Sequence, residues 1–250
     1  MKKLIVANWK MNPNDKTSVQ RFLAALARAR AALKYADVVV APPFPYLALF
    51  SRSSAYALGA QDIFWEKEGA YTGEVSGLML KTFGAEYVIV GHSERRRMHE
   101  TDEIVAKKVR RALDSKLTPI VCVGEERRDA DGVFFSVIRA QLEHSLASVK
   151  QSEIGRVVVA YEPLWAIGAG HKPATPKDAA EAALFIKKTV AARFGSTRAK
   201  SLRVIYGGST APDNAADFLR ERDVAGLLVG RESLNPKSFI AIVQCARTTS

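Results

Sequence analysis

"VVVAYEPLW", residues 157–165, joins a five-residue apolar run to a Glu-Pro pair. The run has no alternating polar positions, which is typical of a strand that is buried on both faces. Helices have to cover both faces of such a strand, and this arrangement requires parallel pairing with its neighbours. The stretch therefore indicates an α/β protein built on a parallel sheet.

Further short apolar runs are spread along the chain, at residues 3–8, 37–41, 56–61, 87–91, 118–124, 203–207 and 226–230. The segments between them have helical spacing. In "VQRFLAALARARAALK" (19–34) one face carries Phe22, Leu23, Leu26 and Leu33. Eight strand-plus-helix units in 250 residues is the number that closes a (β/α)8 barrel. We therefore expect an α/β chain that forms one barrel domain over residues 1–250.

The composition is that of an ordinary globular protein, with 48% apolar and 25% charged residues and no linker-like segment. The opening "MKKLIVANWK" has too few apolar residues for a signal peptide or a membrane span. Two cysteines that lie far apart, Cys122 and Cys245, favour free thiols in a reducing compartment. These features predict a cytoplasmic protein without a membrane partner.

The chain is basic, with 37 Lys and Arg residues against 26 Asp and Glu residues and a formal net charge of +11. This charge favours anionic partners. The basic residues are dispersed, with their densest cluster in "ERRRMH" (94–99), and they do not alternate with aromatic residues as in single-strand binders. The basic residues are therefore interpreted as a solvated surface, and nucleic acid is not expected as a partner.

Polar residues and glycines follow the apolar runs, where the chemistry of such a barrel gathers. They are Asn8, Lys10, Gln61, His92, Glu94, Glu125, Glu162, Gly207, Gly208, Ser209 and Gly230. Because the carboxyl ends of all eight strands meet at one mouth, a lysine, a histidine and a glutamate are predicted to converge there.

Two of these residues have the chemistry of a proton-transfer pair. Pro163 disfavours helical backbone at Glu162 and holds this residue extended, as a fixed base at the rim. Ser93 is expected to cap a helix whose first amides point toward the His92 ring. Amide donors and the positive helix end disfavour an imidazolium, so His92 is predicted to be neutral and to donate a hydrogen bond.

A third residue, Lys10, would balance negative charge on a ligand. Alternation along the first strand points positions 8 and 10 to the same side, so Asn8 and Lys10 are expected to reach one ligand. No metal or cofactor is predicted. "HE" at 99–100 begins like a zinc-protease helix, but position 103 is Glu where the second His is required.

Six motifs occur in order along the chain: "ANWKMN" (7–12), "GAYTGEVS" (69–76), "GHSERR" (91–96), "AYEPLWAIG" (160–168), "YGGS" (206–209) and "GLLVG" (226–230). Together they resemble triosephosphate isomerase, from residue 3 to about residue 240. The resemblance implies a single-domain (β/α)8 TIM barrel without a cofactor. It also implies an isomerase of glycolysis and gluconeogenesis that interconverts dihydroxyacetone phosphate and D-glyceraldehyde 3-phosphate.

The resemblance implies a role for each site residue. The implied catalytic residues are Lys10, His92 and Glu162, together with Asn8 and with Glu94, which would aim Lys10. The implied substrate-binding residues are Asn8, Lys10, Gly168, Ser209, Gly230 and Arg231, with backbone amides of glycine-rich turns holding the phosphate.

Two further segments take a role from the resemblance. A flap from about Pro163 to Thr175 would close over the enediolate and exclude water. A capping box at Thr175–Asp178, with Pro176 at the first turn, would restart the helix after it. The irregular, aromatic-rich loop 59–76 implies a homodimer in which Thr72 reaches toward the partner's active site.

The chain also departs from the family pattern. Arg231 stands where a glycine is usual, Ala169 replaces a threonine, residues 171–176 are one residue longer, and the segment after "HSERR" is one residue shorter. Arg231 leaves open a related isomerase of a four-carbon ketose phosphate. A non-catalytic sugar-phosphate-binding or nucleic-acid-binding barrel, and a phosphate-binding synthase, are further alternatives.

Overall fold

Eight parallel strands close into one barrel in the computed structural model, which describes residues 1–50, 53–129, 131–166 and 173–249. In chain order the strands are β1 (Leu4–Asn8), β2 (Asp37–Ala41), β3 (Ala57–Ala60), β4 (Ala85–Val90), β5 (Thr118–Val123), β6 (Val158–Tyr161), β7 (Arg203–Tyr206) and β8 (Gly226–Val229). Each strand pairs with its sequence neighbours, and β1 pairs with β8, Leu4 opposite Gly226, to close the ring. The predicted (β/α)8 barrel is confirmed.

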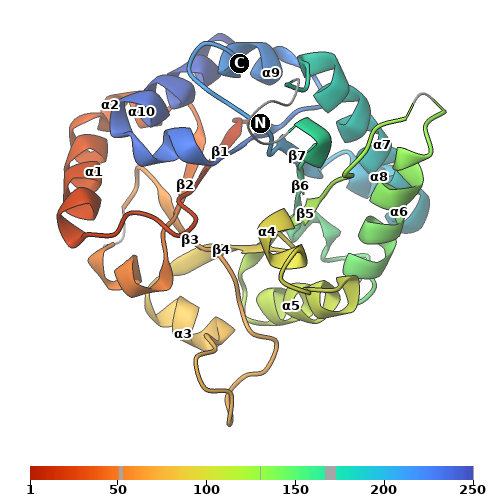
Figure 1. The fold of residues 1–250 in the computed structure, drawn as a ribbon, viewed down its shortest axis with the longest axis horizontal. Helices are drawn as coiled ribbons and strands as arrows, with labels where there is room; N and C mark the ends of the chain where they lie inside the picture. Colours follow the sequence, from red (N-terminus) through yellow and green to blue (C-terminus); the bar gives the residue numbers. More distant parts are fainter. Residues whose placement is uncertain (51–52, 130, 167–172, 250) are drawn as a thin grey trace.

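Helices surround the strands as an outer ring (Figure 1). The α-helices are α1 (Lys16–Arg28), α2 (Arg30–Leu33), α3 (Gly77–Thr82), α4 (Ser93–Arg96), α5 (Asp102–Asp114), α6 (Phe134–Ser145), α7 (Pro176–Phe194), α8 (Ser196–Ala199), α9 (Ala215–Arg220) and α10 (Pro236–Cys245). Short 3-10 turns are η1 (Phe44–Leu49), η2 (Ile154–Arg156), η3 (Leu164–Ala166), η4 (Arg231–Leu234) and η5 (Ala246–Thr249). Within the described ranges, no helix has the length and apolarity needed to cross a membrane.

The core has two layers, one inside the barrel and one between the strands and the helices. Along β5, for example, Ile120 and Cys122 face the barrel interior, whereas Val121 and Val123 pack with the helices. All four side chains are 0–1% exposed. Burial on both faces explains why the strand sequences are continuously apolar, and each fully buried Val or Ile side chain contributes about 1.5–3 kcal/mol.

The predicted helix over 19–34 differs from the observed structure. It is divided at Ala29, whose backbone (φ −90°, ψ 14°) leaves helical geometry, into α1 and α2. Phe22, Leu26 and Leu33 are buried as expected, and Leu23 lies at the edge of the core. No glycine or proline marks the break, so the sequence carries no local signal for it.

Two local predictions are confirmed. The Thr175 side chain accepts from the amide of Asp178, the Asp178 carboxylate accepts from the amide of Thr175, and Pro176 opens α7. Cys122 is a free and buried cysteine, as expected.

Candidate active site

The carboxyl ends of the strands bring several predicted residues together at one mouth of the barrel. Figure 1 shows the short helix α4 lying over the ring of strands, directly after β4. His92 directly precedes α4, and Glu162 directly follows β6. The side chains of His92 and Glu162 contact each other, although the two residues lie far apart in the sequence. Ser93, which begins α4, is 69 positions before Glu162.

Both oxygens of the Glu162 carboxylate have a partner. Oε1 lies 3.0 Å from Nε2 of His92, and Oε2 accepts a 2.9 Å hydrogen bond from the amide of Ser93. Nδ1 of His92 in turn accepts a hydrogen bond from the amide of Glu94, at 3.2 Å. Because Nδ1 is an acceptor, the ring proton is on Nε2, and His92 donates to Glu162 as a neutral imidazole.

The prediction that Ser93 caps α4 is wrong in its assignment. The N-cap residue is His92 itself, whose Nδ1 atom takes the place of the usual capping oxygen. Ser93 is the first helical residue, and its amide is directed at Glu162. The helix start does present amides next to the His92 ring, as expected. The Glu94 amide donates to this ring, and the Ser93 amide donates to the Glu162 carboxylate.

Glu162 is buried, with 3% of its surface exposed. Burial raises the pKa of its carboxyl group, but interaction with His92 and hydrogen bonds from Ser93 outweigh this effect and lower the pKa below its ordinary value. The side chain is therefore an ionised carboxylate held in a nearly dry site.

The backbone of Glu162 is fixed by its neighbours in the barrel. Its amide donates to the carbonyl of Val123 at 2.8 Å. Gly124, the residue after Val123, approaches so closely that a Cβ atom on it would lie 1.8 Å from the carbonyl oxygen of Glu162. Only glycine fits at position 124.

Lys10 lies on the same rim, but the predicted reason for its position is wrong. β1 ends at Asn8, and Lys10 has left-handed backbone (φ 53°), so strand alternation does not extend to it. Instead, the Asn8 side chain accepts from the Lys10 amide at 3.1 Å, and Gln61 donates from Nε2 to the carbonyls of Lys10 and Ala41, each at 2.9 Å.

The Lys10 ammonium forms a 2.7 Å ion pair with Oε1 of Glu94. Glu94 therefore touches both parts of the site, through its carboxylate to Lys10 and through its amide to His92. Gly230, which follows β8, also lies next to Lys10, because a Cβ atom on Gly230 would be 3.5 Å from Cε of Lys10. The predicted lysine, histidine and glutamate are thus linked in one cluster.

Two further predicted residues follow strands that end at the same mouth of the barrel. Ser209 and Arg231 are exposed, after β7 and at the start of η4. Ser233 Oγ donates to the carbonyl of Gly230 at 2.6 Å, which fixes the turn after β8. Gly168 and Ala169, with the rest of residues 167–172 of the predicted flap, lie outside the described residues.

Sequence reasoning missed the support behind Glu162. Glu125 is 1% exposed, and its Oε1 atom accepts from Tyr161 Oη and from Trp165 Nε1, both at 2.8 Å. Burial raises the pKa of Glu125, although the hydrogen bonds from Tyr161 and Trp165 oppose this. The placement of a tyrosine and a tryptophan around "EPL" was the available signal, because buried aromatic donors need acceptors.

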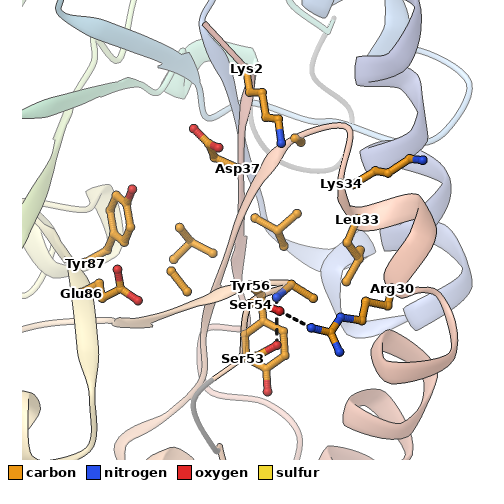
Figure 2. Close-up of a pocket in the computed structure, with 15 residues that line it drawn as sticks. Lys2, Arg30, Leu33, Lys34, Asp37, Ser53, Ser54, Tyr56, Glu86 and Tyr87 are labelled. Atoms are coloured by element: carbon orange, nitrogen blue, oxygen red, sulfur yellow. Dashed lines mark hydrogen bonds between the residues drawn. The ribbon is translucent and has the colours of Figure 1, made fainter.

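A cavity of about 520 Å³ lies at the opposite mouth of the barrel, near the first residues of β2, β3 and β4 (Figure 2). Its lining includes Lys2, Arg30 and Tyr56, and Arg30 donates to Ser54 Oγ there. It shares no residue with the candidate site. Among the residues described, no group of three or more His, Cys, Asp or Glu side chains is arranged to hold a metal ion.

Comparison with known proteins identifies the family of the chain. The family model of triosephosphate isomerase matches residues 3–246. The chain belongs to the triosephosphate isomerase family. It is an isomerase by this membership, and the family's place in metabolism is glycolysis.

Named triosephosphate isomerases are similar to the chain over nearly its whole length. The enzyme of Caldanaerobacter subterraneus subsp. tengcongensis is 44% identical over 245 residues, which cover 96% of this chain and 98% of that protein. The Moorella thermoacetica enzyme is 45% identical, with 96% and 97% covered. The Herminiimonas arsenicoxydans enzyme is 44% identical over 252 residues, with 98% and 99% covered.

Proposed function

We propose that the chain interconverts dihydroxyacetone phosphate and D-glyceraldehyde 3-phosphate through an enediolate, with Glu162 as the base. Glu162 removes a proton from the carbon that carries the hydroxyl group, next to the carbonyl. It returns the proton to the neighbouring carbon, which was the carbonyl carbon, while the hydroxyl proton moves to the oxygen on that carbon. The same carboxylate thus serves as base and, once protonated, as acid.

His92 and Lys10 stabilise the charge that develops on the oxygens. The Nε2–H group of His92 donates to the carbonyl oxygen, and the Lys10 ammonium balances both the enediolate and the phosphate. The Asn8 side chain accepts a hydrogen bond from the backbone amide of Lys10, and the Glu94 carboxylate directs the Lys10 ammonium. Preorganised donors of this kind cost no reorganisation during the reaction.

The observation that carries this proposal is the 3.0 Å approach of His92 Nε2 to Glu162 Oε1, with Ser93 on the other carboxylate oxygen. When a substrate lies between the base and the electrophile, each of these two groups exchanges its contact with the other for a contact with the substrate. The substrate carbonyl oxygen accepts the hydrogen bond from His92 Nε2, and the carboxylate leaves the Ser93 amide for the carbon-bound proton.

Phosphate is held, in this proposal, by backbone amides of Gly168, Ser209, Gly230 and Arg231 and by the Ser209 hydroxyl. Turns rich in glycine allow the backbone to approach a dianion closely. The contact between Gly230 and Lys10 supports this assignment, because it puts a cation beside the turn after β8.

The test is a coupled assay of glyceraldehyde 3-phosphate isomerisation on the purified chain, repeated with Glu162→Gln. We expect turnover by the wild-type chain and a loss of about 10³-fold in kcat for the variant, in the range of a lost general base. Glu126→Gln removes an exposed carboxylate from a nearby loop and should leave kcat unchanged. Wild-type turnover by Glu162→Gln would refute the assigned base.

A related isomerase of a four-carbon ketose phosphate is the second candidate. Arg231 favours it, because an exposed arginine at the start of η4 adds charge and length where the family usually has glycine. Measuring kcat/KM on three-carbon and four-carbon substrates, for the wild-type chain and for Arg231→Gly, decides between the two. A higher wild-type value on the four-carbon substrate would make it the main activity.

A homodimer through loop 59–76, with Thr72 near the partner's active site, is also proposed. In Figure 1 this loop, after β3, projects away from the barrel. Its aromatic residues partly pack on one another, since the Phe64 and Tyr71 rings lie 4.7 Å apart, but Tyr71 remains 45% exposed. Met11 and Met98 are 89% and 65% exposed. Sedimentation that finds an active monomer would contradict the dimer.

We place the chain in the cytoplasm, with small phosphates and not nucleic acid as ligands. The free cysteine Cys122 fits a reducing compartment. Many arginines are engaged in ion pairs within the chain, among them Arg95, Arg96, Arg110 and Arg128. These guanidinium groups are paired with carboxylates of the chain itself and are therefore less available to an external anion.

A further inference from the structure

Arg128 occupies an unusual position for an arginine in a loop. It lies between β5 and α6, in the segment that Figure 1 shows beside α7, and only 15% of its side chain is exposed. A guanidinium that is removed from water needs anionic and aromatic partners to offset the lost hydration. The structure supplies both kinds.

The aromatic partners come from two directions. The guanidinium carbon lies 4.6 Å from the ring centre of Phe134, at the start of α6, and 5.6 Å from the ring centre of Trp165, in η3. Arginine over a tryptophan face is a favourable cation–π arrangement. Arg128 therefore contacts the segment that leaves Glu162, three residues after it.

The anionic partners are both on α7. Nη1 lies 3.1 Å from Oδ1 of Asp178, and Nη2 donates to Glu181. Nη1 is buried and is not aligned for a hydrogen bond with any described residue, so its contact with Asp178 is an ion pair without hydrogen-bond geometry. Asp178 is also the residue whose carboxylate closes the capping box on Thr175.

Hydrogen bonds to the β5–α6 loop also hold the backbone that follows Glu162. The amide of Leu164 donates to the carbonyl of Glu125 at 3.1 Å, and Trp165 donates from its ring to the Glu125 carboxylate. Glu125 precedes Arg128 by three residues in the same loop. The β5–α6 loop thus contacts residues before and after positions 167–172, at Trp165 and at Asp178.

We propose that Arg128 is a positioning residue of the candidate active site, which joins η3 to the start of α7 and thereby fixes the backbone that presents Glu162. This inference rests on the proposed function, since it assigns a role in presenting the base. Arg128 itself does not touch the His92–Glu162 pair.

The experiment compares Arg128→Met with Arg127→Met. Methionine keeps an unbranched apolar stem and removes the guanidinium, and Arg127 is the exposed neighbour, so both variants change the net charge equally. We expect Arg128→Met to lower kcat for glyceraldehyde 3-phosphate about tenfold with KM changed less than threefold, and Arg127→Met to match the wild-type chain. A variant whose thermal midpoint falls while kcat stays within twofold of wild type would overturn the proposal.

A conservative variant separates charge from shape. Arg128→Lys keeps the charge that Asp178 and Glu181 need but loses the planar group that lies over Trp165. We expect it to recover part of kcat, between Arg128→Met and wild type. If Arg128→Met does not fold, Arg128→Lys and Asp178→Asn still decide the matter, because wild-type kcat in both would refute a positioning role.

A second readout does not depend on activity. Hydrogen exchange of peptides covering residues 161–166 should be faster in Arg128→Met than in wild type, and unchanged in Arg127→Met, because the amides of Leu164 and Ala166 are hydrogen-bonded in the anchored turn. A wild-type chain without turnover would refute the proposed function. Unchanged exchange in Arg128→Met would refute the anchor itself.

Discussion

The backbone amide of Glu94 donates to Nδ1 of His92, while the Glu94 carboxylate binds the ammonium of Lys10 at 2.7 Å. One residue thus sets the protonated nitrogen of the imidazole and the direction of the lysine. The two functions use different atoms, so they can be separated by substitution. The amide persists in any side-chain variant, whereas the carboxylate does not.

Glu94→Gln should therefore impair Lys10 without disturbing His92. We expect kcat/KM for glyceraldehyde 3-phosphate to fall about tenfold or more, because the ammonium loses the partner that aims it. The free energy of unfolding should change by less than about 1 kcal/mol, since the pair is half-exposed, at 36% and 50%, and such pairs contribute little. Steady-state kinetics and urea unfolding measure the two effects. Unchanged kcat/KM would show that Lys10 needs no carboxylate partner.

Gly124→Ala tests the close approach that holds the Glu162 backbone. A Cβ atom at position 124 would lie 1.8 Å from the Glu162 carbonyl oxygen, so one backbone segment has to move. Overpacking of this kind costs about 1–3 kcal/mol, and we expect kcat to fall at least tenfold because the displaced residue is the proposed base. Gly155→Ala is the matched control, since its nearest contact would be 3.7 Å away. Equal kinetics in the two variants would contradict the prediction.

The fold was predictable because its signal is repeated and local. Each apolar run is buried on both faces, so strands are visible in the sequence without knowledge of the partners, and β2 begins and ends at the predicted residues. The break at Ala29 and the left-handed backbone of Lys10 were not predictable. They depend on packing and on contacts such as the Gln61 hydrogen bond, from residues distant in sequence.

The residue types of the candidate site were predictable from the sequence, but the contacts that hold these residues in place were not. Glu162, His92 and Lys10 were selected as residues that follow strands, and closure of the barrel brings residues after β1, β4 and β6 to one mouth. The cap at His92 and the anchor at Arg128 require the positions of side chains on other elements. Spacing in the sequence carries no information about these positions.

The buried ion network around Lys108 provides a stability prediction. Lys108 is 2% exposed and lies 2.6 Å from Asp62, which also pairs with Arg95 at 2.8 Å. Asp62→Asn leaves the buried ammonium with the Glu100 carboxylate as its remaining ionic partner, and we expect it to cost about 1–3 kcal/mol in unfolding free energy. Arg220→Met removes one partner of the exposed Arg220–Asp217 pair and should cost less than about 0.5 kcal/mol. Equal losses in urea unfolding would refute this difference.

Glu125 gives the pH prediction, because burial raises the pKa of its carboxyl group above the ordinary 4.5. Below pH 4.5 the group is protonated in both folded and unfolded chains and has no effect on the pH dependence. As pH rises past 4.5, the unfolded chain loses the proton first, so the contribution of Glu125 to stability falls until the raised folded pKa is passed and then stays constant. Glu125→Gln has no proton to lose. Its unfolding free energy, relative to wild type, should therefore increase across this window, which urea unfolding at several pH values between 4 and 8 measures. A difference between the two chains that is flat or falls with pH would mean that the folded pKa of Glu125 is not raised.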